Sequence, residues 1–155
     1  MQDLILRERT EIDSEFFIKL FCEIKSSELH LDSWPELIRQ QMLAMQFHAF
    51  EQCMRAEFPN YIDYVILIQS EKAGRFQIEK NDSYYRIINI SLLSTHRNKG
   101  LGTSILTDLL SEADRKGIPV FLDVDVVNPA LHLYLRMGFK IVRQDEIRYS
   151  MKYSS

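Results

Sequence analysis

The sequence has few of the residues that mark several specialised protein classes. Its 155 residues include only two cysteines, five glycines and four prolines. Cys22 and Cys53 lie outside any CxxC or Cys/His spacing, which argues against a disulfide scaffold or a zinc site. We interpret both as reduced core residues of a protein in a reducing compartment. The scarcity of glycine and proline also excludes collagen-like and low-complexity chains.

Excess positive charge and long apolar runs are lacking as well. Lys and Arg number 19 against 22 Asp and Glu, a formal net charge of −3, so no basic footprint for nucleic acid is present. No apolar run approaches the roughly 20 residues of a membrane span. In the first residues, MQDLILRERTEID, a run of only three apolar residues is followed by a charged one, whereas a signal peptide needs a longer apolar run. We therefore expect a cytoplasmic enzyme or binding domain with neither nucleic acid nor a membrane as partner.

What is present is an ordinary globular composition, 46% hydrophobic and 26% charged. The length predicts one domain over residues 1–155, and no repeat or linker interrupts it. Apolar spacing predicts strands at Leu4–Arg7, Tyr61–Gln69, Arg75–Lys80, Tyr84–Leu93, Val120–Val124, Phe139–Val142 and Ile147–Met151. It predicts helices at Ile12–Ile24, Trp34–Glu57 and Gly100–Lys116, and a short helix between Asn128-Pro129 and Gly138. Asn128 would cap the short helix. The helix Gly100–Lys116 would have one apolar stripe, formed by Leu101, Ile105, Leu106, Leu109, Leu110 and Ala113. The order of these strands and helices indicates one α+β domain with a mixed sheet.

Three local signals refine these boundaries. Ser33 and Glu36 have the spacing of a capping box, which would start the second helix. Ala73-Gly74 is typical of a turn, which would make Arg75–Lys80 a hairpin partner of the preceding strand. Gly117 is placed as a left-handed C-terminal cap of the third long helix.

The segment from Ser94 to Thr103 joins a predicted strand to a predicted helix and is the most informative in the chain. A helix N-terminus offers unpaired amides and a positive dipole end to a phosphate group. A Walker loop is excluded because Lys99 precedes its glycine. A dinucleotide fingerprint is excluded because Ile105 stands where the third glycine would be and repeated βαβ units are missing.

A third phosphate-binding pattern matches. Arg97-Asn98-Lys99-Gly100-Leu101-Gly102 resembles the coenzyme A pyrophosphate motif of the GNAT superfamily of N-acetyltransferases. The later segment Asn128–Phe139 resembles the second signature of that superfamily, with Asn128, Ala130, Tyr134 and Gly138-Phe139 at the matching positions. The close resemblance covers about Arg86–Phe139, and the earlier residues agree only in the order of elements.

The resemblance implies a single-domain GNAT-like fold. Its mixed, mostly antiparallel sheet of six to seven strands would be flanked by about four helices and splayed at the central strands. It also implies acetyl-CoA as a co-substrate and no metal. By resemblance the coenzyme-binding residues are Leu92, Leu93, Ser94, Arg97, Asn98, Lys99, Gly100, Leu101, Gly102, Thr103 and Asn128. A backbone amide near Leu92 would stabilise the oxyanion.

Tyr134 corresponds to the usual general acid of the family. A phenol with an ordinary pKa of about 10 is protonated at neutral pH and can donate to a departing thiolate. Periodicity alone favours a core aromatic residue between helix and sheet for Tyr134. The matching Asn128, Ala130 and Gly138-Phe139 around it favour the functional interpretation.

The proton acceptor has no obvious candidate, because the strand Tyr84–Leu93 contains no carboxylate or histidine. We hypothesise that Asn89 and Ser91 hold a relaying water, although both could simply satisfy neighbouring backbone groups. Glu79, Asp123, Asp125 and His132 are further candidates. Asp123 and Asp125 share one strand face and could steer a cationic amine.

The leading functional prediction is an acetyl-CoA-dependent N-acetyltransferase that acts on a primary amine by direct attack in a ternary complex. The alternative is a non-catalytic acyl-CoA-binding module for sensing or assembly. The acceptor could be a small molecule or a peptide, and the protein a monomer or homodimer. Trp34 and Ser26–Ser33 are candidates for the acceptor site by resemblance. The apolar stripe of the second helix, which includes Met42, Met45 and Phe47, is interpreted as core or dimer contact.

Overall fold

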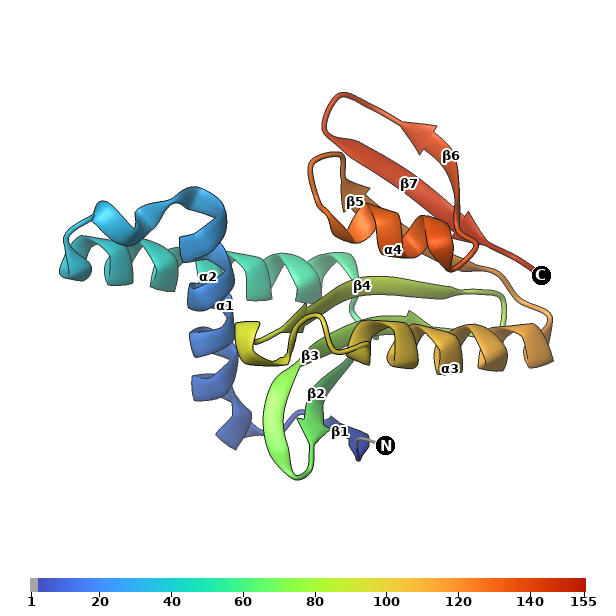
Figure 1. The fold of residues 1–155 in the computed structure, drawn as a ribbon, viewed down its shortest axis with the longest axis horizontal. Helices are drawn as coiled ribbons and strands as arrows, with labels where there is room; N and C mark the ends of the chain where they lie inside the picture. Colours follow the sequence, from blue (N-terminus) through green and yellow to red (C-terminus); the bar gives the residue numbers. More distant parts are fainter. Residues whose placement is uncertain (1–2) are drawn as a thin grey trace. The chain divides into compact units, whose positions relative to one another are not determined.

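The structure is a computed structural model that describes residues 3–155, so residues 1 and 2 of the predicted domain lie outside the described part. The strands are β1 Leu4–Glu8, β2 Ile62–Ile68, β3 Glu71–Lys80, β4 Tyr85–Leu92, β5 Val120–Asp125, β6 Lys140–Gln144 and β7 Arg148–Tyr153. The helices are α1 Ser14–Leu29, α2 Glu36–Glu57, α3 Leu101–Lys116 and α4 Ala130–Arg136, with short 3-10 turns η1 Glu11–Asp13, η2 Leu31–Ser33 and η3 Ser94–His96 (Figure 1).

The seven strands follow the order β1-β2-β3-β4-β5-β7-β6. The pairs β1–β2, β5–β7 and β6–β7 are antiparallel, whereas β4 and β5 are parallel. The parallel pairing of β4 with β5 runs from Tyr85 opposite Val120 to Ile87 opposite Leu122. The predicted α+β class, with a mostly antiparallel sheet and about four helices, is therefore confirmed.

The chain forms two compact units. The first consists of the chain up to Phe76 together with Ser91–Arg97, and the second of Gln77–Ile90 together with Asn98–Ser155. Strands β3 and β4 contribute residues to both, so each unit is described within its own boundaries.

In the first unit, α1 and α2 pack against each other through aromatic side chains. Phe21 of α1 lies edge-on to Phe47 of α2, with 5.5 Å between ring centroids. Phe17, Phe47 and Val65 are buried together and link both helices to β2. The stripe expected on α2 is thus partly core, since Phe47 is buried, whereas Met45 is 74% exposed.

In the second unit, α3 buries one complete face. Its buried residues are Leu101, Ile105, Leu106, Leu109, Leu110 and Ala113, a spacing that places them on one side of a helix. The helix ends at Gly117, which has the left-handed φ of +69° that favours glycine. The predicted apolar stripe and the predicted cap are both confirmed.

The hairpin between β2 and β3 differs from the prediction. The turn residues are Gln69 and Ser70, with φ of +50° and +69°, so β3 begins at Glu71. Gly74 lies inside β3. The position requires glycine because a Cβ there would collide with the backbone carbonyl oxygen of Ser91. The glycine that indicated a turn instead permits a close approach of two strands.

The start of α2 and the state of the cysteines also differ. Pro35 precedes the first residue of α2, and Ser33 belongs to η2, so the predicted capping box does not form. Cys22 is half-buried but Cys53 is exposed, so the interpretation of Cys53 as a core residue was wrong. Both thiols are free. The sequence interpretation failed because nothing in the local pattern distinguishes a cysteine at a helical surface position from one in the core.

Candidate active site

The loop before α3 has the geometry of an anion-binding turn in the second unit. Asn98 and Gly100 have φ of +61° and +78°, and the helix begins at Leu101. The amide of Ser104 donates to the carbonyl oxygen of Gly100 at 3.0 Å, which closes the first turn. The amides of residues 101–103 therefore precede the intrahelical hydrogen bonds and point out of the helix end.

The two signature segments meet in this unit. A Cβ built on Gly102 of α3 would lie 3.5 Å from Cδ2 of Leu133 on α4, an ordinary contact. Leu133 directly precedes Tyr134. The structure therefore brings the start of α3 next to the helix that bears the candidate general acid.

Tyr134 is nearly buried on α4, with 6% of its surface exposed. Its ring lies edge-on to Phe139, with 5.7 Å between centroids. Burial raises the pKa of Tyr134 to about 12. Within the described chain no hydrogen bond to its hydroxyl is found, so this group can donate to a ligand. The ring therefore fills the core position that periodicity indicated. The general-acid role of its hydroxyl stays a prediction.

Asn128 caps α4 as predicted. Its Oδ1 accepts a hydrogen bond from the amide of Ala130 at 2.9 Å. Asn89, on β4 of the same unit, donates through Nδ2 to Oε1 of Gln77 at 3.0 Å. Gln77 is fully buried, and its own Nε2 has no hydrogen-bond partner among the described residues. Asn89 thus belongs to a buried amide pair that retains an unused donor.

The other predicted coenzyme residues lie in the first unit, at the end of β4. The amide of Leu93 donates to the carbonyl oxygen of Ala73 on β3 at 2.9 Å. Because backbone groups alternate along a strand, the Leu92 amide points to the opposite edge of β4. Arg97 donates through Nε to the carbonyl oxygen of Leu92 at 3.0 Å. Ser91, half-buried, belongs to this unit too.

A carboxylate that the sequence did not indicate lies at this strand end. Oε1 of Glu23, from α1, accepts the amide of Ser94 at 2.6 Å and lies 3.7 Å from Nη2 of Arg97. Strand β4 carries no carboxylate of its own, and α1 supplies this one from a distant part of the sequence. No local pattern links Glu23 to Ser94, so only a long-range contact prediction could have found it.

Three of the four remaining candidates for proton transfer have a polar or charged partner. Glu79 accepts the hydroxyl of Tyr84 at 3.2 Å. Asp123 lies 4.0 Å from Arg86 and Asp125 lies 3.7 Å from Arg148, and both carboxylates are exposed. His132 is exposed on α4. Steering of a cationic amine by the two aspartates stays a prediction, and their exposure is equally that of solvated surface charges.

Residues 3–155 contain no group of three or more His, Cys, Asp or Glu side chains arranged to hold a metal ion. None of the helices described is both long and apolar enough to cross a membrane.

Known proteins resemble this chain in sequence pattern and in fold. The model of the Acetyltransferase (GNAT) family matches residues 25–139. No curated protein sequence matches the chain. Solved structures that share the fold include the PaiA N-acetyltransferase of Thermoplasma acidophilum in complex with coenzyme A, with a TM-score of 0.72, 16% identity and 99% of each chain covered. An acetyltransferase of Thermus thermophilus gives a TM-score of 0.70 at 16% identity over the whole of both chains.

A third similar structure is the spermidine N-acetyltransferase of Vibrio cholerae in complex with CoA and spermine. It gives a TM-score of 0.65 at 17% identity and covers 97% of this chain and 95% of that one. Fold and sequence pattern together define the class of protein, an acyltransferase of the N-acetyltransferase type. The chain belongs to the GNAT acetyltransferase family, which supports acyl-CoA-dependent acetyl transfer as its general activity.

Proposed function

We propose that residues 1–155 form one acetyltransferase domain that moves the acetyl group of acetyl-CoA to a primary amine by direct attack. The observation on which this rests is the open first turn of α3. Gly100 turns the chain with a φ of +78°, and the amides that follow it are left without intrahelical partners. Such a turn suits the pyrophosphate of a coenzyme.

We assign the coenzyme to the residues that the sequence motifs indicated. In the second unit these are Asn98, Lys99, Gly100, Leu101, Gly102 and Thr103, with Asn128. In the first unit they are Leu92, Leu93, Ser94 and Arg97. The Leu92 amide, which points away from β3, would hydrogen-bond the thioester oxygen and stabilise the negative charge that develops on it.

In the transfer, the amine nitrogen forms a bond to the carbonyl carbon and the bond from that carbon to sulfur breaks. Tyr134 donates the hydrogen bond, and then the proton, that the departing thiolate needs. A pKa near 12 keeps the phenol protonated across the assayable pH range. The same high pKa makes hydrogen-bond stabilisation of the thiolate a large part of its contribution, since a free thiol has a pKa of about 8.5.

The amine must lose a proton before or during attack. We propose that a water held by Asn89 and Ser91, neighbours on one face of β4, relays this proton to bulk solvent. The pairing of Asn89 with buried Gln77 fixes the orientation of the Asn89 amide, which supports a positioning role.

Direct attack is favoured over a covalent acetyl-enzyme by the state of the cysteines. Burial raises the pKa of the Cys22 thiol, although Arg39 opposes this effect. A thiol with a raised pKa is a poor nucleophile at neutral pH. Cys53 is exposed on α2.

The test is release of free coenzyme A thiol from acetyl-CoA with a panel of amines. Tyr134→Phe should lower kcat by about 10²–10⁴-fold, as expected when a general acid is removed. Tyr153→Phe is the matched control, because it removes a hydroxyl that bonds Asp114 instead. A decrease in kcat of only a few fold in Tyr134→Phe would refute the assigned role.

Coenzyme binding is tested separately with Gly102→Val. The fold has room for a side chain there, since a Cβ would make only ordinary contact with Leu133. We expect the variant to fold and to lose thermal stabilisation by coenzyme A. Stabilisation equal to that of the wild type would remove the pyrophosphate assignment. Stabilisation by acetyl-CoA without transfer to any amine would instead support the non-catalytic binding module.

A further inference from the structure

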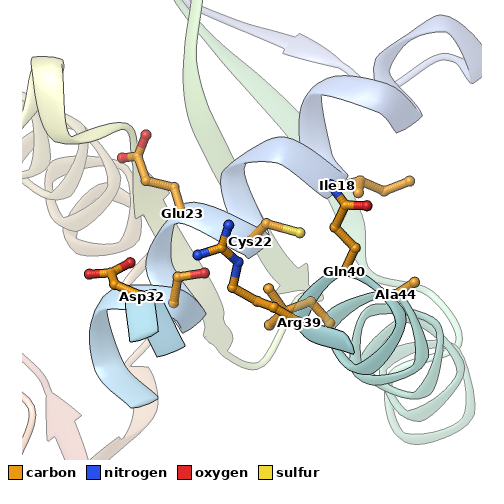
Figure 2. A pocket seen from close by; sticks show the side chains of 9 residues that line it. Ile18, Cys22, Glu23, Asp32, Arg39, Gln40 and Ala44 are labelled. Carbon is orange, nitrogen blue, oxygen red and sulfur yellow. The ribbon is translucent and has the colours of Figure 1, made fainter. Parts of the chain in front are cut away.

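A pocket of about 550 Å³ lies within the first unit (Figure 2). That volume is in the range of small-molecule sites. Its walls come from α1, η2 and α2, and they carry both charged and apolar side chains. The lining residues are Ile18, Cys22, Glu23, Ser26, Asp32, Arg39, Gln40, Leu43 and Ala44.

Arg39 is the unusual residue of this pocket. It is half-buried, and Figure 2 shows its side chain reaching from α2 toward α1. Within residues 3–155, every other buried or half-buried arginine makes an ion pair with a carboxylate; these are Arg7, Arg9, Arg75 and Arg86. Arg39 makes none. Arg39 lines the pocket without an anionic partner from the described part of the protein, so a ligand carboxylate would complete this site.

Two carboxylates line the same pocket. Asp32 is exposed at its rim on η2, and Glu23 projects from α1. Glu23 also accepts the Ser94 amide at 2.6 Å, which joins the pocket to the end of β4 assigned to the coenzyme. An ammonium group near Glu23 would therefore lie beside the strand end where we place the thioester.

We propose that this pocket binds the acceptor, and that the acceptor is an amine that also carries a carboxylate, as a free amino acid does. Arg39 pairs with the carboxylate, while Glu23 and Asp32 face the ammonium group. The proposal rests on the proposed function for the fate of the amine, but the binding site itself is independent of it. A polyamine would leave Arg39 without an anionic partner, whereas an amino acid would give it one.

The experiment compares amino acids with their decarboxylated counterparts. The probes are lysine with 1,5-diaminopentane, histidine with histamine, and phenylalanine with phenethylamine. In at least one pair, the amino acid should have a kcat/KM at least about tenfold higher than its counterpart, as expected for a charge-assisted pair. Arg39→Gln should abolish that preference. Lys19→Gln, which removes a positive charge from an exposed position of α1, should retain it.

A second variant separates carboxylate recognition from general damage. Asp32→Asn should raise KM for both members of a pair and leave their ratio unchanged. The proposal is overturned if the decarboxylated amines are used equally well or better, or if Arg39→Gln leaves the preference intact.

Binding without turnover distinguishes this proposal from the proposed function. If no amine in the panel is acetylated but an amino acid raises the melting temperature of the wild type and not of Arg39→Gln, the pocket assignment holds and the transferase assignment fails. If neither turnover nor stabilisation occurs with any amino acid, the pocket assignment is wrong. Transfer to amines lacking a carboxylate alone would retain the transferase and reject the pocket.

Discussion

The two units differ in what they bury. Among the described residues, the buried charged side chains are Asp13, Glu51 and Arg75, and all three belong to the first unit. The second unit buries the apolar face of α3 and one neutral polar side chain, Gln77. An ionic interior depends on every partner being present, whereas an apolar interior depends on volume. The comparison shows that one small chain can use both solutions.

Arg75 is at the centre of the ionic interior. Its Nη1 lies 2.6 Å from Oε1 of Glu51, and its Nη2 lies 2.7 Å from Oδ2 of Asp63. Arg9 pairs with the same two carboxylates. The Arg75 guanidinium also lies over the ring of Phe17 at 4.2 Å, which adds a cation–π contact. The cluster therefore ties α1, α2, β2 and β3 together through charges.

The largest predicted effect comes from breaking this cluster. Arg75→Met should lower the free energy of unfolding by about 3–5 kcal/mol, because Glu51 and Asp63 then lose their most deeply buried partner and keep the less buried Arg9. The loss should shrink at acidic pH, because burial raises the pKa of Glu51 but its hydrogen bond with Arg75 lowers it, so without Arg75 this carboxyl takes up a proton more readily. Urea unfolding at several pH values measures both effects.

Two control variants separate the loss of buried charge in Arg75→Met from the loss of packing and from the loss of an exposed arginine. Leu106→Ala in the second unit should cost about 2–5 kcal/mol through a cavity, and the cost should stay nearly constant with pH. Arg115→Met removes an exposed arginine from α3 and should cost well under 1 kcal/mol. A pH-independent loss in Arg75→Met would show that the cluster acts by packing and not by charge.

The second prediction concerns Asp13, which is fully buried. Hydrogen bonds from Arg7, with further donors from Lys72 and the Thr10 amide, hold the pKa of its carboxyl well below the usual range. A lowered folded-state pKa stabilises the protein above the unfolded value of about 3.9, and this contribution is lost as the pH falls through the folded value.

Asp13→Asn should therefore flatten the acid limb of stability against pH. One proton contributes at most about 1.4 kcal/mol per pH unit to that slope. Denaturant unfolding between about pH 5 and pH 2 measures the difference from the wild type. Asp145→Asn is a useful control, since Asp145 is exposed and its pKa is lowered by the amides of Ile147 and Arg148. Identical slopes for wild type and Asp13→Asn would rule out the linkage.

The smallest predicted effect is in the second unit. Asn128→Ala should cost about 1 kcal/mol, because the Ala130 amide loses its cap. Asn128→Asp should recover most of this stability, since aspartate is an equally good cap. Hydrogen exchange in α4 and thermal unfolding measure the change. A loss equal to that of Leu106→Ala would mean that Asn128 does more than cap the helix.

The same contrast decides what the sequence could predict. In the second unit the signals are local: the apolar stripe of α3, its cap at Gly117 and the cap of α4 at Asn128 each occupy one segment. All three were predicted correctly. They are the segments next to the two family motifs, so the loop at Gly100 and the helix of Tyr134 could be located as well.

In the first unit the decisive contacts join segments far apart in the chain. Arg9 contacts Glu51 and Asp63, and Glu23 contacts Ser94. Periodicity cannot show such pairs, because each side chain is an ordinary polar residue within its own segment. The prediction of a turn at Gly74 was wrong for the same reason. Glycine is required there by the close approach of Ser91, in a strand that comes later in the chain.

The pairing of β1 with β2 has a consequence for how the chain folds. Leu4 lies opposite Ile68 and Glu8 opposite Tyr64, so the first strand must wait for a partner that follows two helices. Closing a loop of that length costs entropy before any strand contact repays it. During synthesis β1 would leave the ribosome long before β2, and Arg7 could meet nearby Asp13 first. That pair involves side chains only, so the backbone edge of β1 stays unpaired until β2 has been made.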